Sequence, residues 1–418
     1  MKPTDKFLVA IATGLLTALT LQASDWPQFL GPSRNGACPG TDLAEAWPKD
    51  GPPIVWQKKV GQGFSGPVVA SGKLVLFHRE DDKELVECLE AKSGKLLWSF
   101  GYPTAYHDDF GFDEGPRATP AIADGRVITY GAEGMLTCAD LATGRKSWSV
   151  DTKSEFHAPK GFFGVACSPL VEGEDVLLIV GGKNGAGIVA FNKSDGKVLW
   201  KTADDEASYS SPVAGSIAGR RCAFFLTRSA LVAAQPDDGK VLFQFPFRPP
   251  MRNSVTAASP LLINDTVFLS ASYGTGAVLL QLTESAPRKL WASDDALSNH
   301  YATSVYHKGF LYGIHGRTDP GFEPPASLRC VEMKTGKVMW EQASFGAATL
   351  ILAGNQLLLL TERGELIRAP ASSSAFKLSS RAQILPNQVR AHPALADGLF
   401  YARSKDRLVC VSLKKSTP

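Results

Sequence analysis

The stretch KTGKVMW, residues 334–340, returns in closely related forms along the chain. The other copies are SGKLLW at 93–98, TGRKSW at 143–148, DGKVLW at 195–200 and DGKVLF at 238–243. A small residue precedes each aromatic at a constant distance: Cys88, Cys138, Ala190, Ala233 and Cys330. Because glycine supplies the positive φ of a tight turn and alternating apolar residues flank it, each copy predicts a β-hairpin.

A second signature lies upstream of each hairpin: a small residue, often Ser or Thr before Pro, and then two short apolar runs separated by a polar turn. Its copies are Gly66-Pro67, Thr119-Pro120, Ser168-Pro169, Ser211-Pro212, Ser259-Pro260, Thr303-Ser304, Ala348-Thr349 and His392-Pro393. They lie 43 to 53 residues apart. A period of this length filled by four short strands indicates a propeller blade. We therefore predict an all-β, eight-bladed β-propeller of four-stranded antiparallel blades.

The ends of the repeat array suggest how the ring closes. Trp56, in PPIVWQKKV, precedes the first repeat, whereas the eighth repeat ends after its third strand. We expect the strand near 54–60 to join the last blade as its outer strand, since closure removes exposed sheet edges. The seventh repeat, RGELIRAPASSSAFKLSS at 363–380, lacks the Gly turn and the Trp, and we place Phe376 in the position of the Trp.

The N-terminal segment predicts export. Lys2 and Lys6 precede an apolar run at 7–21, so residues 1–23 are interpreted as a signal peptide and the protein as periplasmic or secreted. A membrane anchor is the alternative, but the run is shorter than the ~20 residues of a spanning helix, and we expect no transmembrane span. The first cysteine is Cys38, so we expect no lipobox. Residues 24–53 are predicted to form an irregular strap, and residues 54–418 a single propeller.

Composition excludes some partners and explains the cysteines. With 44 basic and 41 acidic residues, the formal charge is +3, which does not favour a nucleic-acid partner. Four of the seven cysteines, Cys88, Cys138, Cys330 and Cys410, stand at the small position of the repeat and are predicted to be buried thiols. Disulfides among Cys38, Cys167 and Cys222 remain open.

The repeat resembles the tryptophan-docking motif of the exported quinoprotein-like (PQQ-repeat) propellers. This eight-bladed family includes PQQ-dependent alcohol dehydrogenases and the propeller lipoprotein of the outer-membrane barrel-assembly machinery, and the resemblance covers about residues 54–413. It implies that the aromatic of one blade packs on the small residue and glycine of the next, burying about 150–250 Å² each time. The docking residues would be Trp56, Trp98, Trp148, Trp200, Trp291 and Trp340.

For a PQQ enzyme the resemblance implies a clamp of adjacent disulfide-bonded cysteines, a Ca²⁺ site of Glu, Asn and Asp, and a tryptophan floor. The chain has no adjacent cysteine pair and no CxxCH for haem. GGKNGAG at 181–187 lacks the GK[ST] of a phosphate loop and is interpreted as a wide hairpin. No cofactor is predicted firmly; PQQ with Ca²⁺ is the candidate that remains.

The polar loops ahead of the first strand of each blade are predicted to converge on one mouth of the central channel, where they would form a ligand pocket. The candidate ligand-binding residues are Arg117, Tyr209, Asn253, His300, Tyr301, Arg390 and His392. Nearby acidic residues would serve as counter-charges or metal ligands: Asp108, Asp109, Asp113 and Glu114. The competing interpretation is that these loops are polar because they face water.

We expect a non-enzymatic exported propeller that binds a ligand or protein partner through its loop-rich face, the partner being an unknown small molecule or a protein of the cell envelope. The alternative is a divergent PQQ- or metal-dependent oxidoreductase acting on an alcohol or sugar. A third possibility is a carbohydrate-binding propeller that stacks sugars on surface aromatics: Phe110, Phe112, Phe162, Phe163 and Tyr273.

Overall fold

The computed structural model describes residues 25–39, 43–251, 254–319 and 321–415, and within them the chain forms eight antiparallel sheets of a propeller. Seven sheets have four strands, and the eighth carries one additional strand. The predicted eight-bladed all-β fold is therefore confirmed. The signal peptide predicted at 1–23 lies outside the described residues, as does Asn253. Among the described helices, none is both long and apolar enough to span a membrane.

Blades 1 to 4 are built from strands that follow one another in the chain. Blade 1 contains β3 (Val68–Ala70), β4 (Lys73–Glu80), β5 (Lys83–Glu90) and β6 (Leu96–Pro103). Blade 2 contains β7 (Ala121–Ala123), β8 (Arg126–Tyr130), β9 (Met135–Asp140) and β10 (Lys146–Asp151), followed by the short helix α1 (Thr152–Phe156). Blade 3 contains β11 (Leu170–Glu172), β12 (Asp175–Ile179), β13 (Ile188–Asn192) and β14 (Val198–Thr202). Blade 4 contains β15 (Val213–Ile217), β16 (Arg220–Leu226), β17 (Ala230–Ala234) and β18 (Val241–Pro246).

Blades 5 to 7 continue the same order, and blade 8 combines both ends of the chain. Blade 5 contains β19 (Leu261–Ile263), β20 (Thr266–Ala271), β21 (Gly276–Gln281) and β22 (Arg288–Ser293). Blade 6 contains β23 (Val305–His307), β24 (Phe310–His315), β25 (Ser327–Glu332) and β26 (Val338–Gln342). Blade 7 contains β27 (Ala348–Ala353), β28 (Gln356–Thr361), β29 (Glu365–Pro370) and β30 (Ser380–Gln383), with β1 (Ala37–Cys38) parallel to β27. Blade 8 contains β31 (Ala394–Ala396), β32 (Leu399–Arg403), β33 (Arg407–Ser412) and β2 (Ile54–Lys59).

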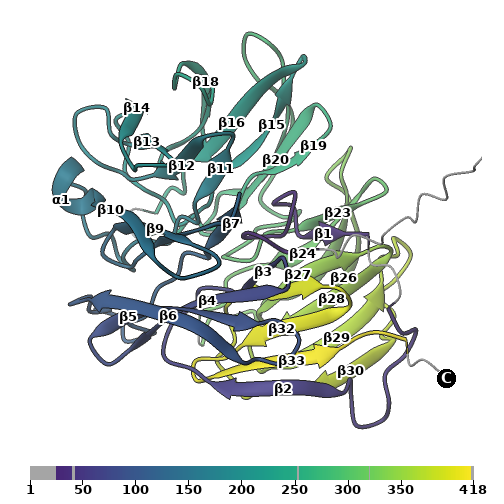
Figure 1. The fold of residues 1–418 in the computed structure, drawn as a ribbon. Coiled ribbons are helices and arrows are strands. Elements are labelled where there is room, and N and C mark those ends of the chain that lie inside the picture. The colour runs from purple at the N-terminus through teal and green to yellow at the C-terminus, as the bar shows by residue number, and fades with distance from the viewer. Residues whose placement is uncertain (1–24, 40–42, 252–253, 320, 416–418) are drawn as a thin grey trace, which may run out of the picture.

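The ring closes as the sequence predicted. The N-terminal strand β2 pairs antiparallel with β33, which places Trp56 opposite Cys410. Figure 1 shows the purple β2 lying beside the yellow β33. Because the two strands come from opposite ends of the chain, blade 8 forms only when both ends are in place.

A β-bulge in the outermost ladder positions each docking tryptophan. In every blade except the seventh, the pairing of the third and fourth strands shifts register next to the aromatic, as at Trp148 and Trp200. Such a bulge reorients the side chain. Each indole N–H then donates to a carbonyl of the following blade, to Ala91, Leu141, Lys193, Pro236, Met333 and Ser372 for Trp56, Trp98, Trp148, Trp200, Trp291 and Trp340 respectively.

The seventh blade differs from the expectation. Phe376 does not occupy the position of the Trp, because it precedes β30, and Ser380 of that strand pairs with Arg368, which stands where most other blades carry the small residue. Phe376 instead packs against Trp340 of blade 6, with ring centroids 6.0 Å apart. Phe376 therefore contacts the docking tryptophan of the preceding blade. The outer strand of blade 7 carries the exposed Arg381, which makes an ion pair with Glu365.

The small position of the repeat is buried in each blade that carries Cys or Ala there. Cys88, Cys138, Cys330 and Cys410 are fully buried free thiols, and Ala190 and Ala233 occupy the same place with no exposed surface. Burial raises the pKa of the Cys88 and Cys330 thiols to about 11, so they stay protonated and apolar at neutral pH. The sequence did not decide whether Cys167 and Cys222 form disulfides, and in the structure both are free thiols.

The segment before the first blade crosses the inner edges of the innermost strands. Trp26 is buried and exchanges two backbone hydrogen bonds of 2.8 Å with Val69 of blade 1. Further along, Arg34 donates to the carbonyls of Ser168 and Pro169 in blade 3, at 3.0 and 2.8 Å. The segment reaches blade 7 as β1. Its hydrogen bonds satisfy strand edges that would otherwise be unpaired in the channel.

Candidate functional site

A cavity of about 190 Å³ lies at the channel mouth and is surrounded by the residues ahead of the first strands. Six of the seven candidate ligand residues line it; the seventh, Asn253, lies outside the described residues. The six are Arg117 ahead of β7, Tyr209 ahead of β15, His300 and Tyr301 ahead of β23, and Arg390 and His392 ahead of β31. Residues from different blades thus meet in one site.

A ring of hydroxyls links the blades around this cavity. The backbone N–H of Gly66 donates to Thr119 Oγ1 in the next blade, at 3.1 Å. The same bond repeats from blade to blade, from Thr119 to Ser168, Ser168 to Ser211, Ser211 to Ser259 and Ser259 to Thr303, at 2.9 to 3.1 Å. The Ser or Thr of the repeat signature therefore accepts a hydrogen bond from the backbone of the preceding blade.

The ring of hydroxyls is interrupted on one side, where three consecutive blades carry Ala348, His392 and Gly66 at the equivalent position. His392 is buried, and neither of its ring nitrogens has a hydrogen-bond partner among the described residues. Burial lowers the pKa of His392 to about 4, so its imidazole is neutral at neutral pH. A neutral imidazole carries one donor and one acceptor, and both are left for a ligand or water.

Two further polar atoms at the cavity are also without a partner. The hydroxyls of Tyr301 and Thr349 are buried and make no hydrogen bond to the described residues. Because a buried unpaired polar group costs about 1–3 kcal/mol, such groups are normally satisfied. Together with His392, they form the polar pole of the cavity.

His300 is held in a defined orientation beside Tyr301, with ring centroids 6.0 Å apart. Its Nδ1 accepts the backbone N–H of Thr318, at 3.2 Å, so the proton of the neutral ring is on Nε2. Nε2 lies 2.9 Å from the hydroxyl of Tyr273. Burial lowers the pKa of His300 to about 4, with Asp319 opposing and Arg317 and Arg390 assisting the shift. His300 is thus a neutral wall residue whose nitrogens are already used.

Three arginines surround the mouth, and each has its own carboxylate. Arg117 Nη2 lies 3.2 Å from Asp108 Oδ2, and Arg390 Nε donates to Glu362 at 2.6 Å. Arg317 pairs with Asp319 at 2.5 Å in the adjoining loop. Each guanidinium also lies over aromatic rings, within 4.3 to 5.7 Å of the centroids of Phe64, Tyr106, Phe163, Phe112, Tyr273 and Phe322.

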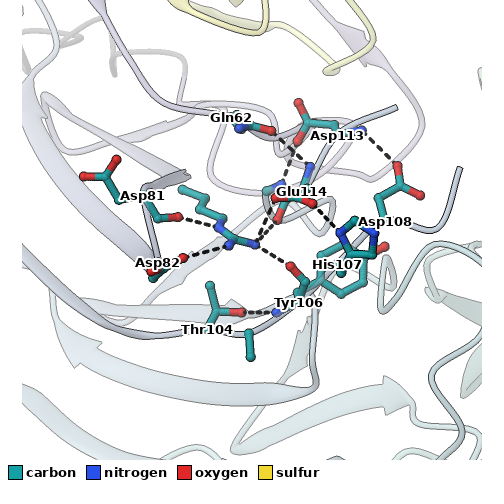
Figure 2. A network of polar contacts seen from close by, with 12 residues as sticks. Gln62, Asp81, Asp82, Thr104, Tyr106, His107, Asp108, Asp113 and Glu114 are labelled. Carbon is teal, nitrogen blue, oxygen red and sulfur yellow. Dashed lines mark hydrogen bonds and ion pairs between the residues drawn. The ribbon is translucent and has the colours of Figure 1, made fainter. Parts of the chain in front are cut away.

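The loop that carries the four acidic candidates is fixed by Arg79. Its guanidinium donates to the carbonyls of Asp81 and Tyr106 at 2.7 and 2.6 Å and lies 3.5 Å from Asp82. Figure 2 shows this network, with His107 against Glu114 at 2.6 Å and Thr104 beside Tyr106. The long connection between blades 1 and 2 is therefore ordered by its own hydrogen bonds.

The acidic candidates are engaged within the protein. Asp108 accepts from the backbone of Phe112 and of Asp113 in addition to its ion pair, and Asp113 Oδ1 accepts from Gly115. Asp109 pairs with Lys160 at 2.8 Å, and Glu114 with His107. Within the described residues, no three His, Cys, Asp or Glu side chains are grouped so that they could hold a metal ion.

Three of the aromatic candidates, Phe112, Phe163 and Tyr273, line the cavity, whereas Phe110 and Phe162 lie outside the lining. Phe110, half exposed, packs on Phe162 and Phe163 with centroids 6.0 and 5.1 Å apart, and Phe112 packs on Phe163 at 5.8 Å. The Tyr209 hydroxyl accepts the backbone N–H groups of Phe162 and Phe163, at 2.8 and 3.0 Å, which joins these rings to the cavity wall. The four phenylalanine rings therefore form one cluster of contacts, of which Phe112 and Phe163 reach the cavity.

Sequence reasoning missed part of the lining. Phe29 comes from the strap, Phe64 precedes the first blade, and Thr349 replaces the proline of the repeat signature. The departure of Ala348-Thr349 from Ser/Thr-Pro was the available signal for the last of these. A groove of about 970 Å³ between blades 6 and 7 adjoins the cavity and shares Phe64, Phe112, Asp319 and Arg390 with it.

The fold and site define an eight-bladed propeller of PQQ-like repeats with an axial cavity. A family model described as outer membrane protein assembly factor BamB matches residues 82–320, more than half of the chain, and the chain belongs to this family.

The chain is similar to quinoprotein alcohol dehydrogenase PedH of Pseudomonas putida, with 26% identity over 191 residues, 43% of this chain; it spans about 30% of the length of that curated relative. Among solved structures, BamB from Moraxella catarrhalis has a TM-score of 0.64 at 14% identity, covering 88% of this chain and 99% of that one. Quinohemoprotein alcohol dehydrogenase from Comamonas testosteroni has a TM-score of 0.64 at 15% identity, covering 94% and 82%. At these identities, the structures show a shared fold.

The described residues do not fit the PQQ and Ca²⁺ clamp that the resemblance implies. Asp319, the carboxylate in the described lining, already pairs with Arg317. Asp108 and Asp113 of the neighbouring loop accept backbone N–H groups, and Asp108 also pairs with Arg117. The aromatic lining of the cavity consists of Phe and Tyr among the described residues, without the tryptophan floor. We derive no chemical step through that cofactor.

Proposed function

We propose that the protein is a non-enzymatic, exported propeller that binds a small ligand in its axial cavity through the loop-rich face. The observation that carries this proposal is the polar pole of buried atoms at His392, Tyr301 and Thr349, which lack partners among the described residues. A cavity with apolar walls and a few convergent polar groups is the usual form of a small-molecule site. Membership of a family described by an assembly factor supports a binding role over catalysis.

The test blocks the cavity without removing any of its interactions. Ala257 lines the cavity, so Ala257→Trp is expected to fill it, whereas Ala142→Trp adds the same bulk at an exposed turn and serves as the control. A diverse fragment library would be screened by ligand-observed NMR against both variants and the unmodified chain. Binding that is lost only in Ala257→Trp supports the proposal. Fragments that bind equally to all three proteins, or to none, would contradict it.

A quinoprotein-type oxidoreductase is the second candidate, favoured by the similarity to a quinoprotein alcohol dehydrogenase. Its test is calorimetric titration with PQQ, with and without Ca²⁺, followed by dye reduction with alcohols and sugars. Saturable Ca²⁺-dependent binding with turnover would place the oxidoreductase first. Absence of heat at millimolar PQQ would eliminate it.

A further inference from the structure

The charges around the axial cavity are already balanced. Arg117, Arg317 and Arg390 are paired with Asp108, Asp319 and Glu362 at 3.2, 2.5 and 2.6 Å. The two histidines of the lining are neutral at neutral pH, because burial depresses their pKa. A charged ligand would therefore enter without a free counter-charge in the described lining.

Burying a charge without a partner is far less favourable than burying a neutral polar group that is hydrogen-bonded. A carboxylate could gain an arginine only by displacing a carboxylate already bound to it, and Asp108 has no exposed side-chain surface on which to be solvated. The electrostatics of the site thus select against anions. A cation likewise meets no unpaired carboxylate in the described lining, because Asp319 is bound to Arg317.

The walls are largely aromatic, and the lining atoms that have no partner among the described residues belong to His392, Tyr301 and Thr349. The rings of the lining are Phe29, Phe64, Phe112, Phe163, Tyr209 and Tyr273. Aromatic surfaces interact most favourably with other rings in offset or edge-on arrangements. At the pole, His392 offers one donor and one acceptor, while Tyr301 and Thr349 add hydroxyls that both donate and accept.

We infer that the ligand of this cavity is a small, uncharged aromatic compound carrying a hydroxyl or carbonyl group, with its ring among the Phe and Tyr side chains and its polar group at His392. This inference rests on the proposed function, since it specifies the ligand of the same cavity. The compound completes the hydrogen bonds where the hydroxyl ring of the blades is interrupted.

A matched set of probes tests the charge preference: benzyl alcohol, benzoate and benzylamine share one ring and differ in charge. Their dissociation constants would be measured by ligand-observed NMR with the mature chain at neutral pH. We expect benzyl alcohol to bind at least about tenfold more tightly than either ion, because only the ions lose solvation without a partner. Benzoate or benzylamine binding as tightly as benzyl alcohol would overturn the inference.

A second comparison tests the polar pole. Benzyl alcohol should bind about fivefold more tightly than toluene to the unmodified chain, since one hydrogen bond is added. In His392→Phe, which keeps a ring of similar size, the two probes should bind equally. If benzyl alcohol keeps its advantage over toluene in this variant, His392 does not receive the polar group and the inference fails.

Failure of the inference is distinguishable from failure of the proposed function. Fragments that bind at the cavity, lose binding in Ala257→Trp and are charged or aliphatic would leave the binding function standing and overturn the aromatic ligand class. If no fragment is sensitive to Ala257→Trp, the proposed function and this inference fail together.

Discussion

The ring of Phe29 meets the imidazole of His392 edge-on, with centroids 5.5 Å apart and planes inclined by 79°. The contact joins the segment before the first blade to the last blade, across the axis of the propeller. It also places a residue of the strap in the cavity lining, beside the His392 nitrogens, which have no partner in the described parts of the chain. The strap therefore both covers strand edges and shapes the candidate site.

The two aromatics of the strap are expected to have separate roles. Trp26 is buried and Trp26→Ala should release the strap, whereas Phe29 is partly exposed to the cavity and Phe29→Ala should mainly weaken benzyl alcohol binding. Hydrogen exchange of the amides of Val69 and Ile122 reports the strap, because they donate to Trp26 and Pro27. Exchange should accelerate in Trp26→Ala and stay unchanged in Phe29→Ala. Equal acceleration in both variants would contradict this division.

Tryptophan docking should be measurable as a coupling between Gly196 and Trp148. A Cβ at Gly196 would lie 2.6 Å from the indole, with φ at +74°, whereas Gly219, at φ +83°, has no atom within 4 Å. Both Gly→Ala changes carry backbone strain of about 1 kcal/mol, and Gly196→Ala adds about 1–3 kcal/mol of overpacking. Denaturant unfolding would give the free energies.

The matched cycle uses Trp148→Ala, expected to cost about 3–5 kcal/mol by itself. In that background, Gly196→Ala should cost no more than Gly219→Ala, because the ring that it meets is gone. An unchanged excess cost would mean that the glycine is required for the turn alone.

Each hydroxyl oxygen of the ring should contribute to stability through the one inter-blade hydrogen bond that it accepts. Ser211→Ala removes the acceptor of the Ser168 N–H, a 2.9 Å bond between two buried residues, and leaves that donor unpaired. The expected loss in the free energy of unfolding is about 1–3 kcal/mol. Ser216→Ala, at an exposed position of β15, is the control and should stay within about 0.5 kcal/mol. If both variants lose the same free energy of unfolding, the inter-blade hydrogen bond does not contribute to stability.

Stability should depend on pH through Glu84, a buried residue that accepts the backbone N–H of Ala132 in blade 2 at 2.8 Å. Burial raises its pKa to about 7. The hydrogen bond from the Ala132 N–H and the charge of Arg79 oppose the shift, and Glu133 adds to it. The folded state therefore holds the proton that the unfolded state loses near pH 4.5.

The stabilisation from the protonated Glu84 is present below pH 4.5 and is lost as pH rises to about 7. Glu84→Gln keeps a neutral group of similar shape and should flatten this part of the curve of unfolding free energy against pH. Glu155→Gln, in the short helix α1, is the exposed control. If the slope between these pH values is the same in Glu84→Gln as in the unmodified chain, the carboxyl is not protonated in the fold.

The periodic pattern of the chain was enough to predict its blades. Hairpin turns and alternating apolar residues recur at the same offsets, and these local signals are repeated along the chain. Trp56, which precedes the first repeat, indicated the closing strand. The candidate residues ahead of the first strands were found for the same reason. The prediction for Phe376 was wrong, since the seventh repeat lacks the turn that sets the register, and Ser380 stands at the position of the Trp.

The sequence by itself determined the architecture, the docking tryptophans and the residues that converge on the axis, because pleat, turn and repeat length depend on neighbours in the chain. Only the tertiary structure decided that Arg390 is neutralised by Glu362, that the side chains of Thr349 and His392 have no hydrogen-bond partner among the described residues, and that Phe29 joins the lining. The physical reason is that burial, pairing and cavity shape are set by contacts between different blades and the strap, and these contacts exist only once the ring is closed.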